Sequence, residues 1–265
     1  MTVLAIETAT RCVGCALWDE GAPLASFTLV AGPRHAEVLM PAIDELCRRA
    51  GLSAADIEAV AVDVGPGLFT GLRVGLATAR TIAIARGLPA VGVTSLEALA
   101  HPHRRRPGLV AAVVDARRGE VYWALYRSDG TDMQELRPPS LATPEQLASE
   151  LAGLSPAPLA VGDGAWRYRE PIESAGARSG GPLDLWPSPT VIAELGTARL
   201  AGVGPVSPLP DGAQAVAHPW FESLPLPLYL RQADVRIGWE QVGGRVGLAK
   251  APAPKSGVAS SRSGP

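Results

Sequence analysis

Short apolar segments separated by polar turns open the chain and predict three β-strands. Residues 3–8, 12–18 and 24–30 are such segments, and the turns between them are only a few residues long. Consecutive segments of this length joined by tight turns are typical of an antiparallel meander. Over residues 34–50 the apolar positions change to a helical period. The positions that follow this period are Leu39, Ile43, Leu46 and Cys47.

The pattern next predicts a buried strand, a turn and an apolar helix. Residues 57–64 are apolar except for two acidic positions, which is typical of a strand covered on both faces. A Gly-Pro-Gly turn at 65–67 leads into a predicted helix over 71–86 that is apolar on almost every side. Such a helix is usually buried on both sides. A short strand at 90–93 and a short helix at 95–100 complete the first half.

The same order of elements begins again after a linker rich in proline and arginine at 101–108. Strands are predicted over 109–115 and 121–126, and further helix and strand pieces extend to about residue 234. A strand-strand-strand-helix-strand-helix order that occurs twice indicates a duplicated α/β unit. This layout predicts the superfold of the actin-like ATPases and sugar kinases.

The duplication predicts two subdomains, at residues 1–103 and 104–236. The remaining residues, 237–265, are rich in Gly, Ala, Ser and Pro and are expected to be disordered. Hydrophobic residues make up 47% of the chain and charged residues 19%, which is enough apolar material for a folded core. The net charge is −2, so no long-range field attracts nucleic acid, and any RNA contact needs a local patch or a partner.

The expected cellular location follows from the missing targeting and membrane segments and from the small number of cysteines. Six residues precede the first acid, Glu7, without a basic start or a long apolar run, so a signal peptide is not expected. No stretch has the ~20 apolar residues that a bilayer requires. The three cysteines fit a reducing compartment, and we expect the cytoplasm. Cys12 and Cys15 would point to opposite faces of one strand, which argues against a shared metal ion.

A nucleotide contact is possible at five positions. The turn before the apolar helix could bind phosphate at the helix N-terminus, and the first strand ends with an acidic residue. These positions are Glu7, Thr8, Gly65, Gly67 and Arg73. The turn lacks the Gly-x-x-x-x-Gly-Lys-Ser/Thr pattern, and the only lysines are Lys250 and Lys255. The alternative is a tight turn that lets the helix pack closely.

Several separated motifs resemble the TsaB family. They are Ile6-Glu7-Thr8, His35-Ala36-Glu37, the segment from Gly65 to Gly75, the segment from Asp115 to Tyr122, and Leu228-Tyr229-Leu230-Arg231. The resemblance is dense over residues 1–127 and thin to about 235. It implies a subunit that pairs with a catalytic paralogue, TsaD, and an ATPase, TsaE. That complex transfers a threonylcarbamoyl group to adenosine 37 of tRNAs that read codons beginning with A.

Two departures separate this chain from the catalytic paralogue. Ser95 and Leu99 occupy the positions at which the resemblance places two metal-binding histidines. Arg11 and Cys12 occupy the positions of an acidic pair. Leucine has no lone pair to bind a metal ion. We therefore predict a non-catalytic scaffolding subunit with no catalytic residue, no metal and no cofactor.

The two predicted helices of the first half offer more apolar area than one sheet face can cover, and the resemblance places the partner on them. The residues predicted to contact TsaD, or a second copy of the chain, are His35, Leu39, Ile43, Leu72, Leu76 and Ala79. We expect tRNA to be contacted only indirectly, through the complex. The basic cluster at 103–106 could contact tRNA phosphates directly, and the alternative is that it is a solvated linker.

Two other functions remain as alternatives. The first is an actin-like nucleotide-binding phosphotransferase, which predicts that the purified chain binds ATP. A glycoprotease-like metalloenzyme predicts bound zinc, although the sequence has neither Gly-x-Ser-x-Gly nor His-Glu-x-x-His.

Overall fold

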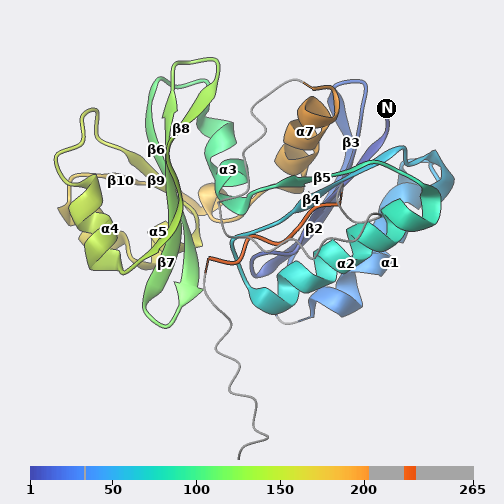
Figure 1. Ribbon diagram of the computed structural model, residues 1–265, viewed down its shortest axis with the longest axis horizontal. Helices are drawn as coiled ribbons and strands as arrows, with labels where there is room; N and C mark the ends of the chain where they lie inside the picture. Colours follow the sequence, from blue (N-terminus) through green and yellow to red (C-terminus); the bar gives the residue numbers. More distant parts are fainter. Residues whose placement is uncertain (33, 203–223, 231–265) are drawn as a thin grey trace, which may run out of the picture. The chain divides into compact units, whose positions relative to one another are not determined.

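Two five-stranded sheets form the framework of the computed structural model (Figure 1). The structure describes residues 1–32, 34–202 and 224–230. All of these fall within one compact unit, Met1–Arg231. The predicted boundary at residue 236 and the predicted tail at 237–265 lie outside the described residues.

The first sheet has the strand order β3-β2-β1-β4-β5. Its strands are β1 (Val3–Glu7), β2 (Cys12–Asp19), β3 (Ala22–Val30), β4 (Ala59–Asp63) and β5 (Ala90–Val93). β1, β2 and β3 form the predicted antiparallel meander. β4 pairs parallel to β1, and β5 pairs parallel to β4. The helices between these strands are α1 (His35–Arg49), η1 (Ala54–Asp56) and α2 (Phe69–Arg86).

The second sheet repeats this order as β8-β7-β6-β9-β10. Its strands are β6 (Gly108–Arg117), β7 (Glu120–Ser128), β8 (Met133–Ala142), β9 (Leu159–Val161) and β10 (Arg178–Ser179). α4 (Pro144–Leu151), α5 (Asp163–Arg167), α6 (Arg169–Ser174) and η3 (Pro182–Asp184) connect or follow them. Each sheet therefore has a central first strand, an antiparallel meander on one side and parallel strands on the other. This confirms the predicted α/β class, the duplicated unit and the actin-like superfold.

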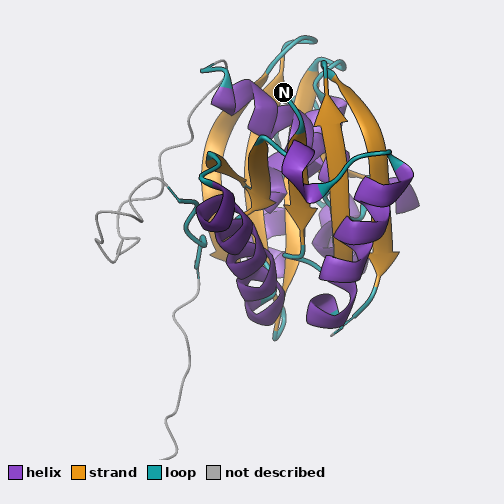
Figure 2. Ribbon diagram, turned by 90° about the vertical axis from the view of Figure 1, so that its right-hand side faces the viewer, coloured by secondary structure: helices purple, strands orange, loops and turns teal. Residues whose placement is uncertain are grey.

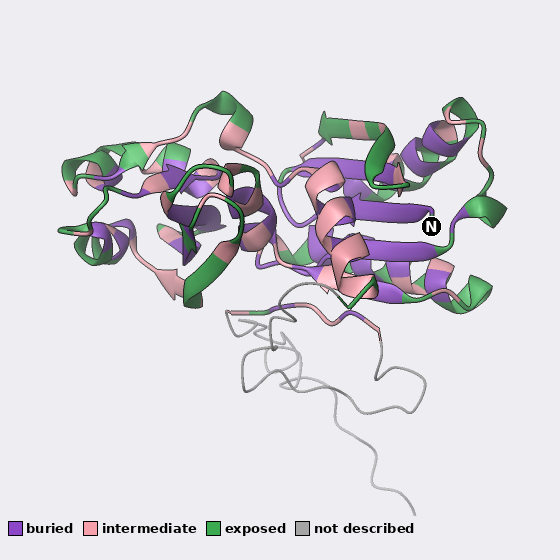
Figure 3. Ribbon diagram, turned by 90° about the horizontal axis from the view of Figure 1, so that it is seen from above, coloured by how far each residue is buried: buried purple, intermediate pink, exposed green. Residues whose placement is uncertain are grey.

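Helices cover both faces of the first sheet (Figure 1). The even-numbered residues of β1, such as Leu4 and Ile6, form a core with apolar residues of α1 and α2. The odd-numbered residues, such as Val3 and Ala5, pack against α7 (Pro189–Leu200) on the other face. Because both faces are covered, β1 and β4 are buried throughout, as Figure 3 shows. Helix α7 lies with the first sheet although it follows the second sheet in sequence.

A short helix joins the two repeats. α3 (Ser95–Ala100) continues into η2 (His101–His103), and η2 leads directly to β6. Leu96 and Leu99 of α3 pack in one core with residues of β6 and β7. Figure 2, seen from the side of the N-terminus, shows strands with helices alongside them. The predicted linker at 101–108 therefore begins with a helical turn, η2, and the helix before it, α3, is anchored by packing.

The described segment 224–230 returns to the first repeat. The Leu228 amide donates to the carbonyl of Val64, and the Arg80 guanidinium donates to the carbonyl of Pro225 at 3.0 and 2.6 Å. The Tyr229 ring lies 5.5 Å from the ring of Phe69. This segment therefore connects α2 with the end of β4.

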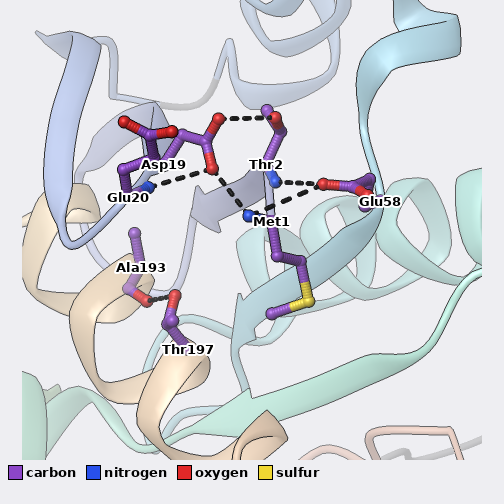
Figure 4. Close-up of polar contacts among 7 residues, drawn as sticks. All are labelled: Met1, Thr2, Asp19, Glu20, Glu58, Ala193 and Thr197. Atoms are coloured by element: carbon purple, nitrogen blue, oxygen red, sulfur yellow. Dashed lines mark hydrogen bonds and ion pairs between the residues drawn. The ribbon is translucent and has the colours of Figure 1, made fainter.

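A polar network closes the opposite end of β1 (Figure 4). The Met1 amino group lies 2.7 Å from Asp19 Oδ1, and the Thr2 amide donates to Glu58 Oε2 at 2.7 Å. The Thr2 hydroxyl also donates to Asp19 Oδ2 at 3.2 Å. These contacts join β1 to β2 and to the start of β4, so the buried groups at the other end of β1 are held on a fixed strand.

Candidate functional site

Two buried carboxyl groups lie at the ends of neighbouring parallel strands. Glu7 ends β1 and Asp63 ends β4, and the register Ile6 opposite Val62 places the two residues side by side. Glu7 Oε1 accepts hydrogen bonds from the Thr10 amide at 3.2 Å and the Thr10 hydroxyl at 2.9 Å. Asp63 Oδ1 accepts from the Gly65 amide at 2.7 Å. The second oxygens, Glu7 Oε2 and Asp63 Oδ2, have no partner among the described residues.

This burial changes the ionisation of both groups. Loss of hydration raises the pKa of Glu7 well above its ordinary value, and the charge of Asp63 raises it further. Burial also raises the pKa of Asp63 to about 7, against hydrogen bonds from Ser95 and Gly65 that lower it. Two neighbouring carboxylates in a buried site repel each other, so the pair retains a proton near neutral pH.

Ser95 and Leu99, the positions at which the resemblance implies metal-binding histidines in the paralogue, belong to the folded core. The Ser95 hydroxyl donates to Asp63 Oδ1 at 2.7 Å. Leu99 is buried against strands of the second sheet. Among the described residues, no group of three or more His, Cys, Asp and Glu side chains is arranged to hold a metal ion. Ser95 therefore fixes one buried carboxyl, and Leu99 fills apolar space.

The glycines of the turn and of α2 serve a close contact within the chain. A Cβ at Gly67 would lie 2.1 Å from the Ala9 carbonyl oxygen, and one at Gly71 would lie 2.0 Å from the Thr8 carbonyl oxygen. The Thr8 hydroxyl donates to the Gly71 carbonyl at 2.8 Å. These glycines thus allow the turn between β1 and β2 to pack closely against the start of α2.

The five candidate nucleotide positions therefore have different surroundings. Glu7, Thr8 and Gly65 are buried, and Gly67 is partly buried. Arg73 is exposed, and its guanidinium lies 3.8 Å from the centre of the Phe69 ring. The geometry brings Glu7, Thr8 and the glycines together around the start of α2 but leaves only Arg73 fully open to solvent. A nucleotide contact at these positions stays an untested prediction.

The second repeat carries a corresponding acidic pair, which was not predicted from the sequence as a site. Asp115 lies near the end of β6, and its amide donates to Asp163 Oδ1, at the start of α5, at 2.9 Å. Burial raises the pKa of Asp163 to about 6, and the charge of Asp115 contributes. Unlike the first pair, Asp115 lies beside two guanidinium groups, those of Arg117 at 3.2 Å and Arg167 at 3.5 Å. The duplication was the available signal, because Asp115 and Glu7 occupy similar places in the two units.

A pocket of about 640 Å³ opens beside the start of α2. Its lining residues are Arg11, Gly32, His35, Leu68, Phe69, Thr70, Gly71 and Arg117. His35 is buried and its Nε2 lies 2.9 Å from the Thr10 carbonyl oxygen, so this side chain fixes the turn after β1. Arg11, where the resemblance implies an acid in the paralogue, is exposed at the pocket. The pocket therefore combines cationic and apolar walls.

The six side chains predicted to contact a partner lie in the chain's own interior. His35, Leu39, Ile43, Leu72, Leu76 and Ala79 are all at most 5% exposed. The apolar period had marked the faces of α1 and α2 that cover the sheet, so these side chains are not the ones that a partner would touch first. The same helices expose Met40, at 51%, and Ile84, at 59%. That α1 and α2 form a partner interface stays a prediction, and its contact residues would be exposed ones such as Met40 and Ile84.

The basic cluster at 103–106 is partly paired within the chain. His103 Nε2 lies 3.5 Å from Asp184 Oδ1, and Arg104 donates to Glu194 Oε1 at 2.7 Å. Arg105 and Arg106 are exposed. Two of the four cluster residues thus hold neighbouring elements in place.

Cys12 and Cys15 are separate, free and buried, as is Cys47. Burial raises the pKa of Cys12 to about 12, and the nearby charges of Glu7 and Asp163 act in the same direction. The same cause, burial, raises the pKa of Cys15 to about 12. These thiols are therefore poor nucleophiles and poor metal ligands.

No helix among the described residues has the length and apolar character that crossing a membrane requires.

Comparisons with known proteins place this arrangement in a family. Residues 29–163 match the family model described as TsaD, tRNA N6-adenosine threonylcarbamoyltransferase. YeaZ from Pseudomonas aeruginosa has a similar structure, with a TM-score of 0.66 and 29% identity over 76% of this chain and 93% of that chain. The Escherichia coli tRNA threonylcarbamoyladenosine biosynthesis protein TsaB is 42% identical over 132 residues, 49% of this chain and 56% of that protein.

The chain spans little more than half the length of the Escherichia coli relative. A second relative, the Haemophilus influenzae protein of the same name, is 31% identical over 161 residues, 57% of this chain and 68% of that protein. The similarity in sequence and in structure confirms the resemblance. The chain belongs to the TsaB family.

Proposed function

We propose that this chain is a non-catalytic subunit of a tRNA threonylcarbamoyltransferase complex. It pairs with a TsaD-type catalytic paralogue, and a TsaE-type ATPase joins the pair. The complex modifies adenosine 37 of tRNAs that read codons beginning with A. This function places the chain in the cytoplasm. The support comes from the family, because the relatives' names assign them to threonylcarbamoyladenosine biosynthesis.

The observation that carries the non-catalytic role is the environment of Ser95 and Leu99. The resemblance places the paralogue's metal-binding histidines at these two positions. Here the Ser95 hydroxyl is committed to Asp63, and Leu99 is committed to the apolar core between α3 and the second sheet. Neither side chain supplies a metal ligand at this place, so the transfer chemistry belongs to the partner.

The partner surface that we propose is the outward side of α1 and α2. These helices pack their buried sides on the first sheet, and they lie next to each other in Figure 1. Their outward sides carry Met40, Ala77 and Ile84, which are exposed. Exposed apolar side chains on adjacent helices are typical of a protein interface. A second copy of the chain would use the same surface when the paralogue is absent.

Co-elution with the paralogue tests this surface. We expect the double variant Met40→Glu/Ala77→Glu to abolish co-elution in size-exclusion chromatography, because it buries two unpaired charges in the interface. Leu183→Glu is the matched control, since Leu183 is 97% exposed on η3 and also exchanges an apolar side chain for a charge. Full co-elution of the double variant would reject this placement of the interface.

A further inference from the structure

Two arginine side chains share one buried carboxylate at the end of β6. The guanidinium groups of Arg117 and Arg167 both approach a single oxygen, Asp115 Oδ2, at 3.2 and 3.5 Å. The Asp115 side chain is only 4% exposed, whereas those of Arg117 and Arg167 are 44% and 58% exposed. One buried carboxylate therefore holds two guanidinium groups whose outer sides remain open to solvent, so the exposed groups of this ion-pair cluster are the cations.

Arg11 adds a third cation across the neighbouring pocket. Arg11 and Arg117 line the same pocket, and no acidic residue is among its lining residues. The Arg11 side chain forms no ion pair with the part of the chain that the structure describes. Arg11 of the β1–β2 turn and Arg117 of the β6–β7 turn thus line one pocket, and Arg167 of α5 shares Asp115 with Arg117, in a chain whose net charge is −2.

The backbone at the β6–β7 turn holds Arg117 in an unusual conformation. Arg117 and Arg118 have φ angles of 63° and 57°, in the left-handed region that L-residues rarely occupy. The Arg117 amide also donates to Asp115 Oδ1 at 2.9 Å. Arg118 and Gly119, both with positive φ, are the two central residues of the β6–β7 hairpin, a turn that requires this geometry, and Arg117 precedes them at a register shift of the strand pair. The hairpin and the hydrogen bond to Asp115 hold the backbone of Arg117 in place.

Aromatic rings alternate with arginines beside this charge, in the stretch Trp166-Arg167-Tyr168-Arg169. The Arg169 guanidinium lies 5.5 Å from the Trp166 ring centre, and Arg167 lies 5.5 Å from that of Tyr168. Trp166 is 42% exposed. Exposed aromatic rings next to guanidinium groups suit unpaired nucleic-acid bases, which stack on such rings while the cations meet phosphates.

We propose that Arg11, Arg117, Arg167, Arg169 and Trp166 form a surface that binds the phosphodiester backbone of RNA, with Trp166 stacking on an unpaired base. This inference rests on the proposed function, which supplies a tRNA as the RNA. It replaces the expectation that tRNA meets this chain only through its partners. Arg167, Arg169 and Trp166 lie outside the pocket lining, so the positive charge continues beyond the pocket. That extent fits a chain of phosphates better than one small anion.

Binding of an unmodified tRNA transcript to the full chain, followed by fluorescence anisotropy, tests the surface. At low salt we expect Arg11→Ala/Arg167→Ala to weaken binding at least tenfold. The slope of log affinity against log salt concentration should become shallower by about 1.5, because each lost phosphate contact contributes about 0.7–0.9. We expect Trp166→Ala to weaken binding about fivefold with little change of the salt slope, since stacking releases no counterions.

The matched control removes the same charge elsewhere. Arg127→Ala/Arg178→Ala also deletes two exposed arginines, but near the opposite end of β6, where Arg127 lies opposite Leu109 and Arg178 lies opposite Leu159 of the neighbouring strand, roughly 25 Å away for this strand length. We expect this control to change affinity less than twofold. Equal weakening by both double variants would overturn the proposal, because it would show dependence on net charge alone. Unchanged affinity in Arg11→Ala/Arg167→Ala would also overturn it.

A second readout separates this inference from the proposed function. Co-elution with the catalytic paralogue is measured for the same variants, and we expect Arg11→Ala/Arg167→Ala to keep the complex. If that variant loses the complex and keeps its RNA affinity, the surface binds an acidic protein and the RNA proposal is rejected. If the wild-type chain binds tRNA but forms no complex, the surface stands and the proposed function fails.

Discussion

Glu7 and Asp63 lie side by side at the ends of β1 and β4, fully buried, and each has one carboxylate oxygen without a partner among the described residues. Such a pair is costly to ionise, because burial removes hydration and the two charges repel each other. The pair lies at the end of the first sheet from which β4 leads to α2 and at which Ser95 of α3 contacts Asp63. The pair makes stability depend on pH in a definite direction.

Asp63→Asn is expected to remove much of this dependence. The folded-state pKa of Asp63, about 7, is above the value in an unfolded chain, so its contribution is fully favourable below about pH 4 and is lost as pH rises through 7. Each pH unit in that window costs up to about 1.4 kcal/mol of unfolding free energy. The asparagine can still accept from Ser95 and Gly65. Urea unfolding between pH 4 and 8 should show a smaller fall in stability for the variant.

The exposed acid Asp44 provides the control for this measurement. We expect Asp44→Asn to follow the wild-type profile. If Asp63→Asn and the wild type lose the same stability between pH 4 and 8, the carboxyl pair is not the source of the pH dependence.

Gly71→Ala is expected to destabilise the fold strongly. The added Cβ would lie 2.0 Å from the Thr8 carbonyl oxygen, so either α2 or the turn after β1 must move. Overpacking of this kind typically costs about 1–3 kcal/mol. Gly181→Ala is the control, because its Cβ would meet nothing closer than 3.9 Å and its φ of −89° suits alanine. Equal denaturation midpoints for the two variants would contradict the close packing of α2.

Arg80→Ala is expected to loosen the segment 224–230. The Arg80 guanidinium donates twice to the Pro225 carbonyl, and a hydrogen bond to a charged group contributes about 1.5–3 kcal/mol. Limited proteolysis should therefore cleave the variant faster near this segment. Arg49→Ala, which removes only an exposed ion pair with Glu45, should leave the cleavage rate unchanged. A cleavage rate equal to that of the wild type would show that Arg80 does not hold the segment.

The fold could be predicted from the sequence largely because the period of apolar residues follows each element. The strands of the first repeat and the second occurrence of the same order are visible in this way. Periodicity marks which side of a helix is apolar, and it does not show whether a sheet or a partner covers that side. For this reason Leu39 and Leu76 were assigned to an interface, although they cover the first sheet.

The candidate site was less predictable, because its contacts join residues far apart in sequence. The loss of metal-binding histidines at Ser95 and Leu99 could be inferred from the family resemblance. The hydrogen bond from Ser95 to Asp63 and the grouping of Asp115 with Asp163 and Arg167 depend on how the strands and helices meet. No local pattern in residues 115–120 or 163–169 states that these segments are neighbours.

The most direct test of the central claim is formation of threonylcarbamoyladenosine on an unmodified tRNA transcript, with the catalytic paralogue and the ATPase of the same organism. We predict no product from this chain alone, little from the other two proteins, and full activity when all three are combined. Product formed by the isolated chain, or an unchanged rate when the chain is omitted, would contradict a non-catalytic subunit that the complex requires.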